Sequence, residues 1–406
     1  MRRERGACDE ESPPDERGRV VRVLMLVPYP AIQGPLPRLV PLLVDQLRAL
    51  GCEVETEGWS RHSEHEALLE KVVGRSADLW RIYARLRRGR FDVLFITTAH
   101  TRASLTRDIP LVLATRGVCP HRVIEFHGSY SDRLSAPGHA VLKLASRVLV
   151  GTCDATLVLS RQEKAEWSAF YPRARFELVV NPFSPESGGM AAASSSCDVR
   201  GAAATARTQC GNGVPTLLFV GRLIPEKGVL DLVRAVARLN RTIPCRLLVA
   251  GDGPSASVVA ATVEELGIAG SVELLGYVSG SDLARCYQEA DAFVLPTYWA
   301  EGFPMVLCEA MSAGLPIVTT ASRGAADLLE EGVNAIFVPA RRPDLLADAL
   351  GRILSDGSLR TSMSANNLAK VKEFAPDVVA PQYLAILESV VGGSPGGSGT
   401  VAETAP

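Results

Sequence analysis

Two glutamates, Glu301 and Glu309, stand eight residues apart in the second half of the chain. An ionised carboxylate only accepts hydrogen bonds, so each of them suits the hydroxyl groups of a sugar or a ribose. The apolar pattern from Phe303 to Ala313 is typical of a helix, and the first N–H groups of a helix favour an anion such as a phosphate. This arrangement is compatible with a sugar-phosphate site, for which the candidates at the expected helix start are Gly302, Phe303, Pro304, Met305 and Val306.

The residues around these glutamates predict a strand, a loop, a helix and a second strand. Apolar runs at 292–295 and 316–318 are typical of buried strands, and Gly314 ends the helix between them. Such a unit belongs to a parallel sheet, whose ligands bind outside the carboxyl ends of the strands. Glu301 would lie in the loop at that edge and Glu309 two turns into the helix. An alternative is that both glutamates are solvated residues of an amphipathic helix.

Two signatures favour the site. EGFPMVLCEAMSAGLP (301–316) resembles the glutamate-spaced signature of retaining GT-B glycosyltransferases of the family 4 type. GRLIPEKG (221–228), about 75 residues upstream, resembles a second signature of that family. The resemblance implies an α/β chain with the GT-B fold, in which two Rossmann-like domains face a central cleft.

The resemblance also implies roles for single residues. Arg222 and Lys227 match the residues that hold the diphosphate of a nucleotide-sugar donor. Glu301 would reach hydroxyls of the transferred sugar, and Glu309 the ribose. In the first half of the chain, relatives commonly place a His-Gly pair against the transferred sugar, and His127 ends the expected strand at 122–129 in this way. A lone histidine is otherwise more often structural, so the resemblance is what favours a catalytic His127.

Further contacts are expected at turns. Asn181 resembles a residue of the family's loop into the cleft on the acceptor side, and Gly34 stands in the first strand-helix loop, where relatives usually carry two glycines. On the donor side the candidates lie just after expected strands: Gly221, the turn glycines Gly251 and Gly253, and Tyr277. Relatives bind the base of the nucleotide near the position of Tyr277.

A chain of 406 residues suits two domains. Strand and helix patterns alternate through both halves, and a small, polar, Gly-rich stretch separates them. The expected parts are a disordered tail (1–19), an acceptor-side domain (20–183), a flexible linker or insertion (184–213), a nucleotide-sugar-binding domain (214–375), a terminal helix that crosses back to the first domain (376–392) and a disordered tail (393–406).

The composition of the chain limits its expected cellular location and its expected binding partners. Nine cysteines without a CxxC pair, no apolar run that could span a bilayer and no signal peptide favour the cytoplasm, with the inner face of the membrane as an option. Residues 1–183 carry 27 Lys and Arg against 22 Asp and Glu, a net +5, whereas 184–406 carry 16 against 23, a net −7.

The expected helix at 76–90 is either a surface helix packed on the sheet or a basic face for anionic lipid, through Arg81, Arg85 and Arg88. Nucleic acid is not expected as a partner, because the basic residues lack an aromatic platform.

The sequence therefore predicts a metal-independent, hexosyltransferase-like enzyme without a cofactor. It would move a sugar from a nucleoside diphosphate sugar to a hydroxyl of a glycan, a lipid-linked or a small-molecule acceptor, with retention, in cell-surface polysaccharide or glycoconjugate synthesis. Arg222 and Lys227 would take the place of a metal ion. A nicotinamide dehydrogenase is disfavoured because the first loop lacks G-x-G-x-x-G. A GT-B epimerase and a non-catalytic sugar-nucleotide or polysaccharide-binding protein remain alternatives.

Overall fold

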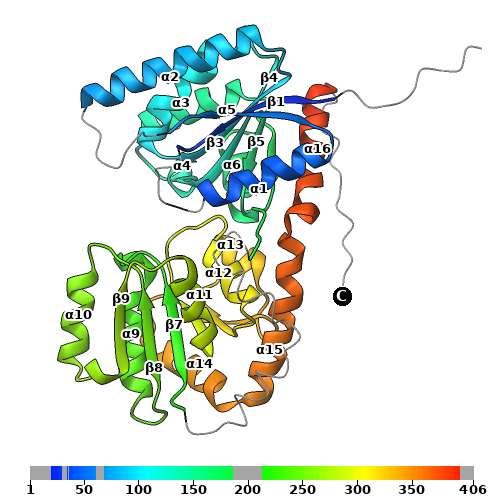
Figure 1. The fold of residues 1–406 in the computed structure, drawn as a ribbon. Helices are drawn as coiled ribbons and strands as arrows, with labels where there is room; N and C mark the ends of the chain where they lie inside the picture. Colours follow the sequence, from blue (N-terminus) through cyan, green and yellow to red (C-terminus); the bar gives the residue numbers. More distant parts are fainter. Residues whose placement is uncertain (1–19, 30–33, 35, 61–67, 186–212, 394–406) are drawn as a thin grey trace, which may run out of the picture.

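The computed structural model describes residues 20–29, 34, 36–60, 68–185 and 213–393. In these ranges the chain forms two α/β domains, one above the other in Figure 1, and the terminal helix α16 (Pro376–Val391) runs along the side of both. The expected tail at 1–19, and most of the expected tail at 393–406 and of the linker at 184–213, lie outside the described residues.

Six parallel strands form the sheet of the first domain, in the order β2-β1-β3-β4-β5-β6. Parallel neighbours need a crossover, which explains the helices between successive strands. Burial on both faces explains the continuous apolar runs of the inner strands β1, β3 and β5, whereas the edge strand β2 is largely polar and exposed. The order is doubly wound, but it opens 2-1-3 rather than with the 3-2-1 of a Rossmann domain. The strands are β1 (Arg22–Val27), β2 (Glu53–Gly58), β3 (Val93–His100), β4 (His121–Ser129), β5 (Ala155–Val158) and β6 (Phe176–Leu178).

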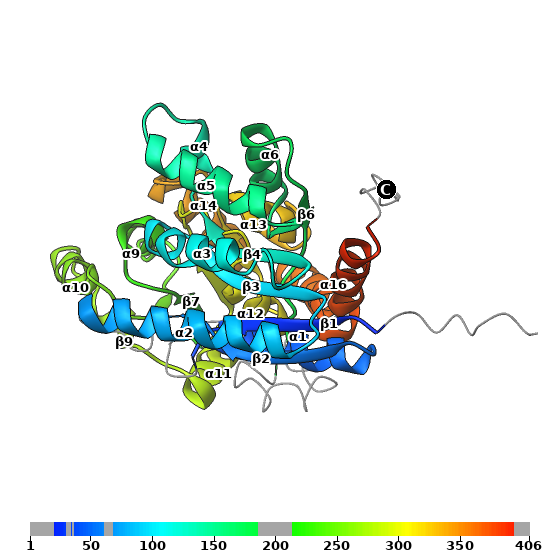
Figure 2. The same cartoon turned by 90° about the horizontal axis from the view of Figure 1, so that it is seen from above.

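Helices cover both faces of this sheet, as the view from above shows (Figure 2). Buried residues of α2, α3 and α5 share one cluster with Leu24 and Ile96, whereas those of α1 and α16 share another with Val23 and Met25. α2 begins earlier than the predicted residue 76. The helices are α1 (Leu36–Ala49), α2 (Leu68–Arg88), α3 (Arg102–Ala114), α4 (Asp132–Ser135), α5 (Ala140–Thr152) and α6 (Arg161–Phe170).

The second domain has a six-stranded parallel sheet in the order β12-β11-β10-β7-β8-β9. Counted from its first strand, this is the Rossmann order 3-2-1-4-5-6. The strands are β7 (Thr216–Val220), β8 (Arg246–Ala250), β9 (Val272–Gly276), β10 (Ala292–Leu295), β11 (Ile317–Thr319) and β12 (Ala335–Phe337). The longer helices are α9 (Val229–Leu239), α10 (Ala256–Glu265), α11 (Gly280–Glu289), α12 (Met305–Ser312), α13 (Arg323–Leu328), α14 (Pro343–Ser355) and α15 (Gly357–Lys370).

The strand order of the second domain reverses between β7 and β10. Crossovers from these two strands leave in opposite directions, so their loops separate at the carboxyl edge and open a crevice where ligands of such sheets bind. The sequence places Arg222 and Lys227 after β7 and Glu301 after β10. The topology therefore brings both signature segments to one point.

The two domains share a continuous hydrophobic core. One cluster of buried side chains runs from Val23 and Leu43 through Phe183 to Phe374 and the terminal helix. The N–H of Phe183 donates to the carbonyl of Phe374 at 2.7 Å, and the ring of Tyr383 lies 6.4 Å from that of Phe95. α16 thus packs against the first domain. None of the helices in the described ranges combines the length and apolar character that crossing a membrane requires.

Candidate active site

Lys227 and Glu301 meet across the switch point of the second domain. Lys227 ends a short 3-10 turn, η1 (Pro225–Lys227), and its Nζ donates a hydrogen bond to Oε1 of Glu301 in the loop after β10. The two side chains are only 10% and 23% exposed. The other oxygen, Oε2 of Glu301, is buried without a hydrogen-bond partner in the described part of the chain. The site thus offers a cation and an acceptor with spare capacity.

Local backbone contacts hold this pair in place. The carbonyl of Glu226 accepts hydrogen bonds from the N–H of Tyr298 at 2.8 Å and from Oγ1 of Thr297 at 3.1 Å. Gly228 has φ 73°, and a Cβ there would lie 2.2 Å from the carbonyl oxygen of Pro296. Only glycine fits, since it tolerates positive φ and lets the two loops approach. The turn that carries Lys227 is therefore bound to the loop that carries Glu301.

Gly251 and Gly253, two of the predicted donor-side glycines, allow the loop after β8 to lie close to the loop after β7. A Cβ on Gly251 would lie 1.9 Å from the carbonyl oxygen of Gly221, and one on Gly253 would lie 2.6 Å from that of Leu223. The loop after β8 therefore lies against the loop that carries Arg222, whose side chain is exposed at the same edge. These contacts explain the glycines structurally; their contact with a donor stays a prediction.

Glu309 lies on α12, largely buried, and accepts a 2.8 Å hydrogen bond from the hydroxyl of Tyr287 on α11. Burial raises the pKa of the Glu309 carboxyl, and the hydrogen bond from Tyr287 and the positive charge of Arg38 partly offset this. Arg38 belongs to α1 of the first domain, so a cation of the opposite domain faces this end of α12. The carboxylate keeps one oxygen for a hydroxyl group of a ligand.

The helix start differs in one respect from the prediction. α12 begins at Met305, because Pro304 is extended (ψ 98°) and Phe303 is buried, with its ring edge-on to Phe374 at 5.6 Å. The first-turn N–H groups of Met305 and Val306 have no acceptor within the helix. Next to them, a Cβ on Gly302 would lie 3.0 Å from Oε2 of Glu163, a residue of the first domain. The helix start therefore faces the first domain.

His127 occupies the carboxyl end of β4, followed by Gly128 with φ 123°. Its side chain is 10% exposed, and its Nε2 lies 3.2 Å from Oε2 of the buried Glu125. Two residues further along β4, the carbonyl of Ser129 accepts a 3.2 Å hydrogen bond from Nη1 of Arg323 in the second domain. The end of the strand that carries His127 therefore faces the second domain.

The remaining candidates, Asn181, Gly34 and Tyr277, make no direct bond to Lys227 or Glu301 among the contacts that the structure describes. Asn181 is 3% exposed, and its Oδ1 lacks a hydrogen-bond partner within the described ranges. Gly34 is exposed, with φ 140°, two residues before the start of α1. Tyr277 follows β9 and is 62% exposed. Their roles toward donor and acceptor stay predictions.

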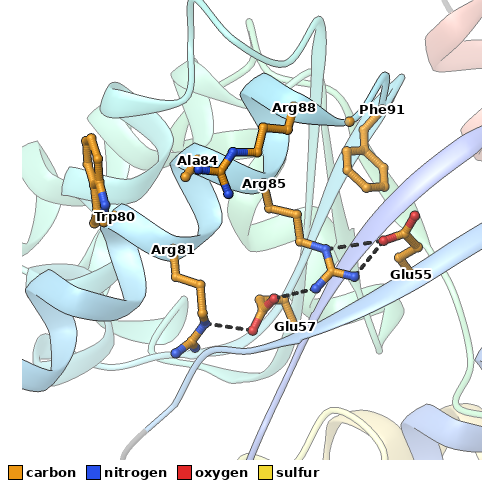
Figure 3. Close-up of a pocket in the computed structure, with 9 residues that line it drawn as sticks. Glu55, Glu57, Trp80, Arg81, Ala84, Arg85, Arg88 and Phe91 are labelled. Atoms are coloured by element: carbon orange, nitrogen blue, oxygen red, sulfur yellow. Dashed lines mark hydrogen bonds and ion pairs between the residues drawn. The ribbon is translucent and has the colours of Figure 1, made fainter.

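The basic face of α2 is mostly paired with carboxylates (Figure 3). Arg81 contacts Glu57 at 2.8 Å, and Arg85 contacts Glu55 and Glu57 at 2.6 and 2.8 Å. These residues line a shallow pocket of about 600 Å³ with the exposed Trp80 and with Arg88. The ion pairs reduce the charge that Arg81 and Arg85 can offer to a lipid surface. They match the alternative of a surface helix packed beside the edge strand β2, and contact with a membrane stays a prediction.

Sequence reasoning missed four residues of this region: Glu125, Tyr287, Arg323 and Tyr383. Glu125 had a visible signal, since it interrupts the apolar stretch 123–126 on the same face of the strand as His127. The other three give no such signal, because their partners are distant in sequence. Arg323 and Ser129, for example, are 194 residues apart.

Two facing α/β domains, a Rossmann-type second sheet and a terminal helix that returns to the first domain define a GT-B fold. The predicted fold class is confirmed by solved structures: the Anabaena protein HepE in complex with UDP and glucose superimposes with a TM-score of 0.65 at 18% identity, over 91% of this chain and 100% of that chain. Residues 206–370 match the family model described as glycosyl transferases group 1. The second domain is therefore similar to that family, in line with the two signatures.

Curated relatives agree with this assignment. An uncharacterized glycosyltransferase of Methanocaldococcus jannaschii is 35% identical over 154 residues, which are 38% of this chain and 39% of the relative. A D-inositol 3-phosphate glycosyltransferase of Corynebacterium glutamicum is 26% identical over 283 residues, 67% of this chain and 66% of the relative. In the first three curated relatives the matched part spans only 39%, 19% and 39% of their length.

Proposed function

We propose that this chain transfers a sugar from a nucleoside diphosphate sugar to a hydroxyl acceptor, with retention of configuration. The observation that carries the proposal is the Lys227–Glu301 pair at the switch point, flanked by Arg222 and by the start of α12. The group 1 match covers all of these residues. The solved relative HepE binds UDP and glucose, which makes UDP-sugars the first donors to test.

The geometry supports the following division of work. The diphosphate of the donor is held by Lys227, Arg222 and the first N–H groups of α12, which stabilise the charge that develops as the bond from the anomeric carbon to the phosphate oxygen breaks. Glu301 accepts hydrogen bonds from hydroxyls of the transferred sugar, and Glu309 from the ribose. The acceptor oxygen bonds to the anomeric carbon on the face the diphosphate leaves, and its proton passes to the departing phosphate oxygen. The products are the glycoside and the nucleoside diphosphate.

Two finer parts belong to the same proposal. Cations of the protein replace a divalent ion, and no three His, Cys, Asp or Glu side chains gather as metal ligands in the described ranges. The acceptor is expected in synthesis of cell-surface polysaccharide or glycoconjugate, at a membrane whose anionic lipids Arg88 of α2 contacts. The relative named for D-inositol 3-phosphate adds a small phosphorylated polyol to the acceptors worth testing.

A thermal-shift screen with UDP-, GDP- and ADP-sugars identifies the donor, since a ligand that binds only the folded state raises the melting temperature. Release of free nucleoside diphosphate is then measured with the selected donor and a set of hydroxyl acceptors. Donor binding without release under any acceptor would refute the enzyme and favour a sugar-nucleotide-binding protein. Formation of a different sugar nucleotide would favour an epimerase.

A further inference from the structure

Three polar groups, two buried and one partly buried, form a chain from the terminal helix to the proposed active site. The hydroxyl of Tyr383, on α16, donates a hydrogen bond of 2.6 Å to Oε1 of Glu125 on β4. The other oxygen of that carboxylate, Oε2, lies 3.2 Å from Nε2 of His127. Glu125 and His127 are two residues apart on one strand, so their side chains share a face of the sheet. The polar chain therefore crosses from α16 to the sheet edge where His127 lies.

Glu125 is held on one side by a group that can only donate to it. Tyr383 is 1% exposed, and burial and the charge of Glu125 raise the pKa of its hydroxyl well above the ordinary value, so the phenol keeps its proton. Packing against Phe95 fixes the ring. The phenol also lies 3.3 Å from the carbonyl of Val180, but its single proton belongs to the shorter bond to the carboxylate.

The carboxylate itself needs an explanation. Glu125 is 1% exposed in the middle of an apolar strand, and a buried carboxylate is costly unless hydrogen bonds satisfy it. Packing alone would be served by an apolar residue, and the phenol alone by the carbonyl of Val180. A carboxylate at this position does what neither can, because it presents an acceptor to the imidazole of His127.

We propose that Glu125 and Tyr383 are positioning residues for His127. Glu125 directs the Nε2–H tautomer toward itself, which leaves Nδ1 as the ring nitrogen for a hydroxyl of the transferred sugar, and Tyr383 fixes the carboxylate. Nε2 and Oε2 are close but not aligned for a hydrogen bond, and such bonds commonly tighten when substrate binds. The inference rests on the proposed function of His127, and it extends that site to a residue 258 positions from Glu125.

The test combines conservative variants with a control on the same helix. Tyr383→Phe removes only the hydroxyl, and Glu125→Gln keeps the shape of the side chain. Ser389→Ala is the matched control, because it removes the 2.8 Å hydrogen bond from Arg175 to α16 without touching Glu125. With the donor found by thermal shift, Tyr383→Phe is expected to lower kcat about tenfold, as the loss of one hydrogen bond that acts in the transition state would. The donor KM of Tyr383→Phe should change less than about twofold. The kcat and the donor KM of the control Ser389→Ala should also each change less than about twofold.

Two further results decide between positioning and a merely structural role. In a His127→Ala background, Tyr383→Phe should have no additional effect on kcat, because its effect passes through the imidazole. Nitrogen NMR of the labelled histidines should show His127 protonated at Nε2 in the natural protein and a changed tautomer balance in Glu125→Gln. An equal loss of kcat from Tyr383→Phe with and without His127, or an unchanged tautomer balance, would overturn the proposal. Because the NMR result needs no turnover, it stands apart from any failure of the transferase assay.

Discussion

Arg323 makes the most direct test of how the two domains are held together. Its side chain is 3% exposed and reaches from the second domain to the first, contacting Glu166 at 2.9 Å, Asp132 at 3.6 Å and the carbonyl of Ser129 at 3.2 Å. Nearby, the N–H of Arg161 donates to Asp327 at 2.6 Å across the same boundary. We expect Arg323→Met to weaken the closed arrangement of the domains.

The structure sets the size of this effect. A buried hydrogen bond to a charged group contributes about 1.5–3 kcal/mol. Since Glu166 is 22% exposed and Asp132 is 53% exposed, water screens part of this, and a net loss of about 2 kcal/mol is reasonable. That corresponds to a change of about thirtyfold in the ratio of closed to separated domains. Arg323 has φ 32°, and Met keeps the backbone strain of that conformation, so the variant isolates the side-chain contacts.

Small-angle X-ray scattering measures the result as a larger radius of gyration in Arg323→Met, with a raised donor KM. The control is Arg246→Met, which removes the exposed 2.6 Å ion pair with Glu273 inside the second domain. Such exposed pairs contribute about 0–1 kcal/mol. If Arg323→Met leaves both the radius of gyration and the donor KM at the values of Arg246→Met, the contacts of Arg323 do not hold the domains together.

Three further predictions concern the donor site. Arg222→Ala and Lys227→Ala should each lower turnover on the order of 10²-fold or more, and activity within a few-fold of the natural protein in both would contradict the assignment. Arg222→Ala should leave the melting temperature nearly unchanged because that side chain is exposed, whereas Lys227→Ala should also lower the melting temperature because Glu301 loses its cation. EDTA should leave transfer intact, whereas loss with EDTA and rescue by Mg²⁺ or Mn²⁺ would mean that a metal ion holds the diphosphate. Glu309→Gln should weaken binding of both UDP and the UDP-sugar in calorimetry. Because burial raises the pKa of Glu309, affinity for the UDP-sugar should fall on acidification from a higher pH than an ordinary glutamate would cause, and Glu309→Gln should lose this dependence.

Much of the fold could be predicted because its signals are local. The apolar runs at 292–295 and 316–318 and the expected strand at 122–129 lie close to the observed bounds of β10, β11 and β4, and the parallel sheet follows from the alternation of strand and helix patterns. The start of α12 shifted by two residues because Phe303 is used to fill the core against Phe374, a contact that the sequence does not reveal.

The candidate site likewise has some features that local sequence signals predict and others that depend on distant contacts. The positions of Lys227 and Glu301 at one edge follow from the strand order, which two sequence signatures imply. Their direct ion pair does not, because it depends on how the carbonyl of Glu226 binds the loop after β10. The ion pairs of Arg81 and Arg85 were missed for a related reason, since periodicity shows which face of α2 is basic but not that β2 presents Glu55 and Glu57 to it.

The Lys227–Glu301 pair leads to a last prediction about the donor. A diphosphate held by Lys227, as proposed, would compete with Glu301 for that cation, and a bare nucleoside diphosphate that won would leave a largely buried carboxylate without its cation. An intact sugar nucleotide supplies hydroxyls to Glu301 at the same time, which removes that penalty. Glu301→Gln should therefore bind UDP at least as tightly as the natural protein does, yet bind the UDP-sugar more weakly.

Calorimetry with both ligands on both proteins tests this, and Glu309→Gln, which is expected to weaken the binding of both ligands, is the comparison. An equal loss of UDP affinity in Glu301→Gln and Glu309→Gln would mean that Glu301 contacts the nucleotide rather than competing for Lys227. If only the sugar nucleotide is weakened in Glu301→Gln, the pair itself contributes to specificity, because it favours a diphosphate that arrives with its sugar.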